Sequence, residues 1–210
     1  MAEGYTRIDM KTWKRAQHCA VFRGSAQPMY SVSFELDITR FLAVIRAKKL
    51  SFTLSFLYAA AASANGIEEF RYRFVDGSVV LYDRIDTSFT YLNPDTELFK
   101  VVNVPMQDTL EDYVALASRT AAAQQVYFTG PLANNVFSFS PLPWVAFTHV
   151  SHTDSGKTDN AIPMIDWGRY YEKNGRIVLP FSVQVHHSFV DGVHIGKLAD
   201  ALQQFLDEYE

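Results

Sequence analysis

The sequence predicts an α+β fold, a large mixed β-sheet covered by helices, and three observations lead to this class. Two dipeptides that favour tight hairpin turns, Asp76-Gly77 and Asn174-Gly175, lie between β-rich runs. Several segments elsewhere have a helical period. Strands and helices do not alternate in the regular order that builds a purely parallel sheet.

The first half of the chain predicts one strand and two helices in succession. Residues 30–36 (YSVSFEL) alternate in polarity, which is typical of a strand with one face in the core. Asp37 can cap a helix that runs to about Lys48. An alanine-rich helix then starts at Thr53 and stops at about residues 65–66, where an Asn-Gly pair follows.

The second half adds two further helices between and after the hairpins. One begins after Asp108, with Glu111 completing a capping box, and runs to about Gln125. The chain ends in an amphipathic helix over 193–208, which carries a stripe of leucines at Leu198, Leu202 and Leu206.

Composition is that of an ordinary globular chain. The 210 residues are 48% hydrophobic and 20% charged, which is enough for a substantial core. No internal repeat or linker-like stretch divides the sequence, so we expect a single domain over residues 1–210.

The charge pattern and cysteine content exclude several classes of function. The formal net charge is −4 and like charges form no long block, which argues against nucleic acid or a membrane surface as partner. Cys19 is the only cysteine, which fits a reducing compartment. The N-terminus lacks an apolar signal-peptide run, so a cytoplasmic location is expected.

The most informative stretch is RIVLPFSVQVHHSFVDGVHIGK, residues 176–197. An apolar strand delivers His186 and His187, and Asp191-Gly192 follows just before the last helix. A histidine at a strand end is held by the sheet while it faces a cleft, and its neutral imidazole can accept a proton near pH 7. The residues alone leave two interpretations open: a general base, or a structural histidine pair beside a helix-capping aspartate.

A metal site is a weaker interpretation of the same histidines. Adjacent strand residues point to opposite faces, so His186 and His187 cannot easily join His194 around one ion. His149 and His152 likewise lack a carboxylate or thiolate neighbourhood that would close a metal site. We therefore predict that no metal is bound.

The run LPFSVQVHHSFVDGVH closely resembles the active-site signature of the chloramphenicol acetyltransferases. Three further blocks resemble the family's corresponding segments in the same order: KTWKRAQHCAVFRG, IDTSFTYLNPDTELF and SFSPLPWVAF. Together the four blocks span most of the chain. This is a far more specific signal than an isolated HxxxDG.

The resemblance implies a fold, an assembly and a reaction. The fold is that of the CoA-dependent acyltransferases, assembled as a homotrimer with active sites at the subunit interfaces. The reaction is direct transfer of an acetyl group from acetyl-CoA to a hydroxyl of chloramphenicol in a ternary complex, without an acyl-enzyme. That activity confers antibiotic resistance.

The resemblance also assigns roles to single residues. His187 matches the general base, and positioned proton transfer of this kind contributes about 10²–10⁴-fold in rate. Asp191 matches an aspartate that pairs with an arginine near the N-terminus, and Arg23 matches that arginine. Ser140 matches the serine that donates a hydrogen bond to the tetrahedral oxyanion. His186 is expected to face away and serve structure.

Two binding regions follow in the same way. The resemblance places Tyr30, Phe99 and Thr90 in the acceptor pocket, although packing in the core would also explain these side chains. Lys49 and Tyr170 are the candidates for contacts with CoA.

Two positions depart from the family pattern. Asp166, on the CoA side of the site, falls where the family usually carries a threonine that helps to hold a water beside the oxyanion. A bare carboxylate there would oppose the developing charge, unless Asp166 turns away, pairs with Arg169 or stays protonated. His152 falls on an expected strand where the family's acceptor pocket is apolar. Together they suggest a more polar, even cationic, acceptor with Asp166 as its counter-ion.

Three alternatives remain at this stage. One is a CoA-dependent acyltransferase of the same fold with a different, more polar hydroxyl or amine as acceptor. The second is the catalytic domain of a dihydrolipoamide acyltransferase, although the sequence shows no lipoyl-bearing segment. The third is a non-catalytic protein that only sequesters a hydrophobic ligand.

Overall fold

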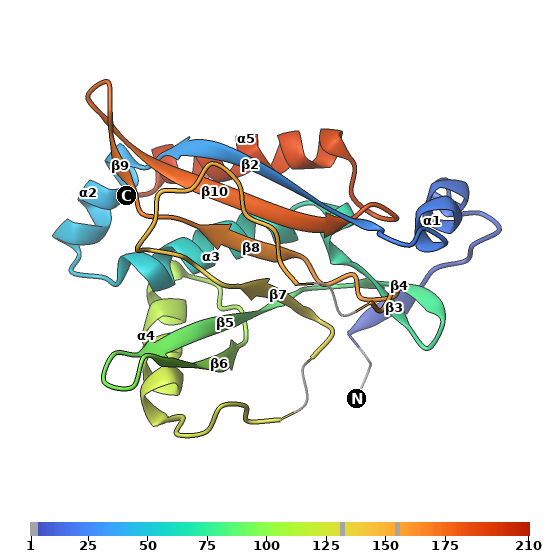
Figure 1. Cartoon of the computed structure of the whole chain (residues 1–210), viewed down its shortest axis with the longest axis horizontal. Coiled ribbons are helices and arrows are strands. Elements are labelled where there is room, and N and C mark those ends of the chain that lie inside the picture. Colours follow the sequence, from blue (N-terminus) through green and yellow to red (C-terminus); the bar gives the residue numbers. More distant parts are fainter. Residues whose placement is uncertain (1–3, 131–132, 154–155) are drawn as a thin grey trace.

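Two β-sheets form the framework of the computed structural model, which describes residues 4–130, 133–153 and 156–210 (Figure 1). The strands of the large sheet, in spatial order, are β2 (Met29–Asp37), β10 (Arg176–His186), β8 (Met164–Trp167), β7 (Val136–Phe139), β5 (Asp86–Asn93) and β6 (Leu98–Val104), and β9 (Tyr171–Lys173) also pairs with β10. The small sheet contains β1 (Tyr5–Arg7), β4 (Ser78–Tyr82) and β3 (Tyr72–Val75).

The large sheet is mixed, which confirms the predicted class. Strands β5, β7 and β8 run parallel to one another, whereas β2, β9 and β8 pair antiparallel with β10 and β6 pairs antiparallel with β5. The helices are α1 (Ala16–Arg23), α2 (Thr39–Ala47), α3 (Phe52–Asn65), α4 (Leu110–Ala123) and α5 (Gly192–Glu208), with a short 3₁₀ turn at Glu68–Arg71.

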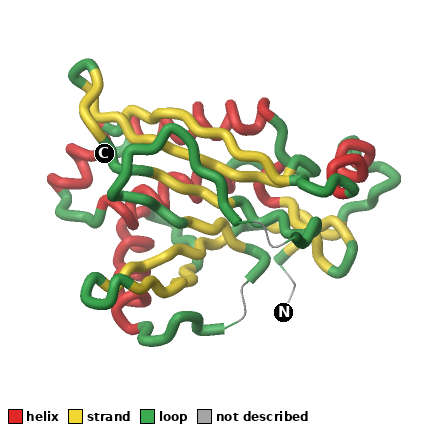
Figure 2. Tube along the Cα trace, in the orientation of Figure 1, coloured by secondary structure: helices red, strands yellow, loops and turns green. Residues whose placement is uncertain are grey.

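The two faces of the large sheet differ in chemistry. Strand β10 directs Phe181 to one side, where it packs with Phe34 of β2 and Phe56 of α3. Alternate residues of β10, Ser182 and Gln184, point to the other side, because side chains alternate along a strand. The apolar face is covered by helices, and the loop between β7 and β8 crosses the polar face (Figures 1 and 2). Ser140 and Asp166 lie on this polar face.

Most of the local predictions are confirmed. Both hairpins turn where predicted, with positive φ angles at Asp76, Gly77, Asn174 and Gly175, from 48° to 78°. The N-cap of α2 is Ile38, one residue after the predicted Asp37, although Oδ1 of Asp37 accepts the backbone N–H of Thr39 at 2.9 Å.

A second cap was also predicted at the wrong residue. Thr109, rather than Asp108, begins α4: its hydroxyl accepts the backbone N–H of Asp112 at 3.1 Å. The partner three residues on is therefore Asp112, and Glu111 instead pairs with Lys48 at 2.9 Å. The sequence offers two overlapping caps here, and only the structure distinguishes them.

Among the residues that the structure describes, no helix has the length and apolar character needed to cross a membrane.

Candidate active site

His187 lies just past the end of β10, where the chain turns towards α5. Its backbone N–H donates to the carbonyl of Pro28 at 2.9 Å, which anchors the residue to the start of β2. The imidazole stacks on Phe22 of α1, with ring centroids 3.8 Å apart, and lies 4.7 Å from the ring of Tyr30. Its side chain is 35% exposed, so two aromatic rings orient an imidazole that still reaches the surface.

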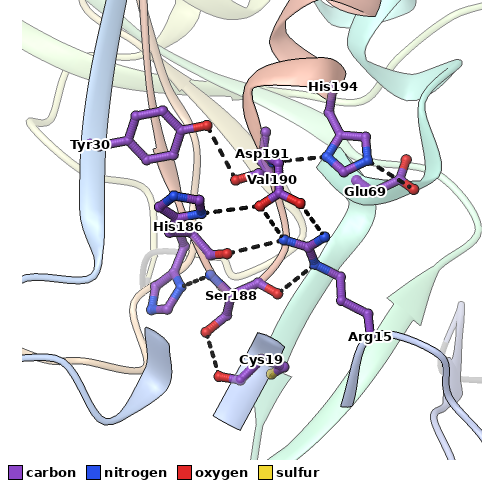
Figure 3. Close-up of polar contacts among 10 residues, drawn as sticks. Arg15, Cys19, Tyr30, Glu69, His186, Ser188, Val190, Asp191 and His194 are labelled. Carbon is purple, nitrogen blue, oxygen red and sulfur yellow. Dashed lines mark hydrogen bonds and ion pairs between the residues drawn. The ribbon is translucent and has the colours of Figure 1, made fainter. Parts of the chain in front are cut away.

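Arg15 fixes the turn that carries His187 (Figure 3). Its guanidinium binds both carboxylate oxygens of Asp191 at 2.6 Å and also donates to the backbone carbonyls of Ser188 and His187 at 2.8 and 3.1 Å. These hydrogen bonds from Arg15 are the largest cause that lowers the pKa of the Asp191 carboxyl. The carboxylate is therefore ionised under ordinary conditions, and the fork geometry of an arginine holds it in one orientation.

Asp191 also lies beside the imidazole. Its Oδ1 is 3.1 Å from Nδ1 of His187, but the ring N–H is not aligned to make a hydrogen bond to it. Nδ1 is buried, so the solvent-exposed part of the His187 side chain consists of its other atoms. The arrangement leaves Nε2 as the nitrogen that can take a proton from a substrate.

The predicted partner of Asp191 is wrong. Arg23 pairs with Asp159 at 2.6 Å, and Arg15 takes the place expected for it. The two arginines lie at opposite ends of α1, about 12 Å apart at 1.5 Å per residue. Only the one that precedes the helix can reach Asp191.

The other histidines of the motif have structural roles. His186 is buried, with its Nε2 2.8 Å from the Thr158 carbonyl and its Nδ1 accepting the backbone N–H of Ser188. In α5, Nδ1 of His194 accepts the backbone N–H of Asp191 at 2.8 Å, and its Nε2 lies 3.4 Å from Glu69. Each imidazole has its own partners, so the three do not converge on one point.

A second region of the molecule forms a cavity of about 650 Å³. It contains Ser140, Thr90 and Phe99, three of the predicted site residues, and further lining comes from the first turn of α3 and from the segment up to Trp144. Tyr30, predicted to line the same pocket, lies beside His187 instead. The structure thus divides the predicted acceptor residues between two places.

The segment after Ser140 is held against the sheet at a glycine. A Cβ atom at Gly168 would lie 2.6 Å from the carbonyl oxygen of Val145, so only glycine allows this approach. The backbone N–H of Arg169 then donates to that carbonyl at 2.9 Å. This contact fixes the wall of the cavity near Trp144.

The two candidate CoA residues lie towards this cavity. Lys49 is in the turn between α2 and α3, two residues before Ser51, which lines the cavity. The Tyr170 ring packs edge-on against Phe52 at 5.6 Å, and its hydroxyl accepts a hydrogen bond from Arg46. The structure therefore brings Lys49 and Tyr170 to the same end of α3.

Asp166 has a different environment from those two residues. It is 1% exposed on the polar face of β8, and its Oδ2 lies 2.5 Å from Nε2 of His152. The partner considered from the sequence, Arg169, does not bind it. His152 lies in the loop between β7 and β8 rather than on a strand, and it does have a carboxylate neighbour. Sequence separation hid this pair, because a loop brings the two residues together.

His187 and Ser140 lie too far apart in one chain to act on one substrate atom. Asp166 pairs across the ladder with Ser182, and Ser140 follows β7 at the same level of the sheet. From there His187 is about 16 Å further along β10 and about 10 Å across two strand spacings. The surroundings of His187 and the surroundings of Ser140 are called the two half-sites below. They are thus roughly 19 Å apart.

Comparison with known proteins gives the class of this chain, an acyltransferase. A sequence model of the chloramphenicol acetyltransferase family matches residues 3–203. A chloramphenicol acetyltransferase from Klebsiella sp is 30% identical over 99% of this chain and 96% of its own length. The chain therefore belongs to the chloramphenicol acetyltransferase family.

Solved structures agree. A chloramphenicol acetyltransferase structure superposes with a TM-score of 0.89 at 28% identity and covers 96% of this chain and 99% of its own. The cubic core of the pyruvate dehydrogenase multienzyme complex superposes with a TM-score of 0.68 over 91% of this chain, at 18% identity. The second likeness shows a shared fold only.

Sequence reasoning missed two residues beside His187. Arg15 and Phe22 both lie in the N-terminal block that carried the resemblance, and their spacing from His187 is visible only in three dimensions. No local signal in the sequence favours Arg15 over Arg23 as the partner of Asp191, because the path of α1 decides which of them reaches it. The bond between His152 and Asp166 has no local signal either.

Proposed function

We propose that this protein transfers the acetyl group of acetyl-CoA to a hydroxyl of chloramphenicol, in the cytoplasm and within a ternary complex. The observation that carries the proposal is His187: its ring is fixed between Phe22 and Tyr30, its loop is held by Arg15, and part of the ring is exposed. A protein that only sequesters a ligand has no use for an imidazole held in this way.

In the proposed reaction, Nε2 of His187 takes the hydroxyl proton as the acceptor oxygen attacks the thioester carbonyl. The tetrahedral intermediate carries its negative charge on the former carbonyl oxygen, to which the Ser140 hydroxyl donates a hydrogen bond. Collapse of the intermediate expels the CoA thiolate, which takes the proton from His187. No acyl-enzyme forms, because no protein nucleophile takes part.

The separation of roughly 19 Å between the half-sites supports a site made of two subunits. We propose a homotrimer in which His187 of one subunit faces the cavity of its neighbour that contains Ser140. A cyclic arrangement gives three equivalent sites of this kind. The alternative of a cationic acceptor with Asp166 as counter-ion loses its main argument, since His152 already pairs with that carboxylate.

The direct test follows CoA thiol release with acetyl-CoA and chloramphenicol. His187→Ala should lower kcat by about 10²–10⁴-fold. His149→Ala removes an exposed imidazole outside the proposed site and serves as the matched control. No release by the unmodified protein, or equal rates for it and H187A, would refute the proposal.

A mixing experiment tests the shared site. H187A and S140A chains, each nearly inactive alone, should regain activity when refolded together, because some interfaces then combine an intact His187 with an intact Ser140. In randomly mixed trimers about a quarter of the interfaces are intact. If the mixture stays as inactive as its parents, both residues act within one chain or do not act together.

A further inference from the structure

The pair formed by His152 and Asp166 is the part of this region that the proposed reaction does not use. Its bond joins Nε2 of His152 to Oδ2 of Asp166 at 2.5 Å, and the second carboxylate oxygen, Oδ1, is buried without a hydrogen-bond partner among the described residues. The backbone N–H of His152 donates to Gln184 of β10 at 3.1 Å, which ties this part of the loop to the sheet. The imidazole is thus held over the polar face of the sheet.

The pair lies next to Ser140. Strands β7 and β8 are parallel neighbours in which Phe139 pairs with Ile165. The residues that follow these two, Ser140 and Asp166, therefore lie side by side on the polar face, about 5 Å apart. The backbone N–H of Ser140 donates to the carbonyl of Ile165 at 3.2 Å. Burial raises the pKa of Asp166, and the Ser140 N–H is one of the contacts that oppose this rise. The net charge of the His152–Asp166 pair therefore changes the electrostatic potential at the Ser140 hydroxyl.

The charge of the pair depends on one proton. With the proton, carboxylate and imidazolium cancel; without it, a buried negative charge adjoins the position proposed for the oxyanion. At an effective dielectric of about 20, such a charge would slow the formation of an oxyanion by about 10²-fold. The Asp166 carboxylate raises the pKa of His152 above its ordinary value, against the opposing effect of burial. The pair therefore keeps its proton to a higher pH than a lone histidine would.

The side chains closest to the pair on the neighbouring strands are hydroxyls and an amide: Ser138, Ser140, Ser182, Gln184, Ser31 and Ser33. Three titratable groups share this face, and each has a partner of its own. Nδ1 of His149 lies 3.5 Å from the hydroxyl of Ser33, Glu35 binds Lys173 at 2.5 Å, and Nε2 of His186 lies 2.8 Å from the carbonyl of Thr158.

We propose that His152 is a charge-balancing, positioning residue for acetyl transfer: it holds one proton against Asp166, so that a neutral pair rather than a bare carboxylate adjoins Ser140. The inference rests on the proposed function, because it concerns the oxyanion formed there. It predicts that activity requires a deprotonated His187 and a protonated His152 at the same time. The rate should fall towards alkaline pH as His152 loses its proton.

The test compares the pH profiles of kcat for four forms of the full-length protein. His152→Leu leaves the carboxylate bare and should lower kcat by about 10–100-fold at neutral pH, with partial recovery as the pH falls and Asp166 takes up its own proton. Asp166→Asn removes the carboxylate; it should keep most of the activity and lose the alkaline decline. The double variant H152L/D166N should recover most of what H152L loses.

The outcomes separate a charge effect from a packing effect. A double variant no more active than H152L, or an alkaline decline that persists in D166N, would overturn the proposal. If H152L fails to fold, the profile of D166N alone decides, since it leaves the imidazole in place.

A second measurement separates this inference from the proposed function. The ring-proton NMR titration of His152 requires no turnover and should lie above that of an ordinary histidine, shift on adding acetyl-CoA, and return to the ordinary range in D166N. If the protein releases no thiol with chloramphenicol at any pH, the proposed acceptor is wrong and this titration alone tests the pair. A His152 that titrates as an ordinary histidine, or that does not respond to acetyl-CoA, would overturn the inference.

Discussion

Two aspartates close to the proposed chemistry are stabilised in opposite ways. Asp191 lies at the His187 end, is 32% exposed, and is bound by both arms of Arg15. Asp166 lies beside Ser140, is 1% exposed, and has one histidine as its partner. The pKa of Asp191 is lowered, chiefly by its hydrogen bonds to Arg15, whereas burial raises the pKa of Asp166.

The difference lies in the partner. An arginine stays charged at every accessible pH, so the Asp191 pair is a permanent link that fixes a turn. A histidine can lose its proton as the pH rises, so the Asp166 pair has two charge states. Asp191 therefore belongs to an ion pair of constant charge at one half-site, whereas Asp166 belongs to a pair whose charge can change with pH at the other.

The largest expected effect is on the permanent link. Arg15→Ala removes four hydrogen bonds to the turn at residues 187–191 and should lower the free energy of unfolding by about 2–3 kcal/mol, less than for a fully buried pair because Asp191 is partly exposed. Arg23→Ala is the matched control: its pair with Asp159 is largely exposed and should contribute about 0–1 kcal/mol. Urea unfolding of both variants measures the difference.

Lys in place of Arg15 sharpens this prediction. Arg15→Lys keeps the charge but loses the fork that binds both oxygens, so its stability should lie between those of R15A and the unmodified protein. A larger loss for R23A than for R15A would show that the turn is supported from the other end of α1.

How far the sequence predicts these two regions depends on how local the determining contacts are. The hairpin at Asp76-Gly77 was predicted correctly, because two adjacent residues determine the turn. The same holds for α5, because the spacing of its leucines predicts a helix with one buried face. The position of His187 at the end of β10 follows from the strand pattern alone.

The partners of Asp191 and Asp166 depend instead on contacts between distant segments. Arg15 and Arg23 have the same side chain. Only the path of α1 in the structure decides which of them reaches the Asp191 carboxylate. His152 meets Asp166 because the loop between β7 and β8 folds back over the sheet, and no periodic pattern encodes that path. The family resemblance was confirmed despite both errors, since it rested on the motif around His187 and the three other blocks and not on these partners.

The second prediction concerns pH and has opposite signs at the two half-sites. The folded-state pKa of His152 is raised above 6.5, so its pair contributes stability that is fully present below that value and is lost as the pH rises through the raised pKa. The folded-state pKa of Asp191 is lowered below 3.8, so its contribution is present above that value and is lost as the pH falls through the lowered pKa. Each effect should amount to about 1–2 kcal/mol.

Unfolding curves from mildly acidic to alkaline pH measure both effects. D166N should remove the alkaline loss and leave the acid loss, and Asp191→Asn should do the reverse. If both variants changed the same limb, the two aspartates would not be independent supports, and the contrast between them would fail.

The smallest expected effect is at Lys49. Lys49 is exposed and does not pair with a carboxylate among the described residues, so Lys49→Ala should leave folding and kcat nearly unchanged. If its ammonium contacts a CoA phosphate, the KM for acetyl-CoA should rise about two- to fivefold, and less so as salt screens the charge. Lys197→Ala, on the exposed side of α5 near the His187 end, removes the same charge elsewhere and should leave this KM unchanged. Equal changes in KM for the two variants would mean that net charge alone attracts CoA, and that Lys49 is not part of its site.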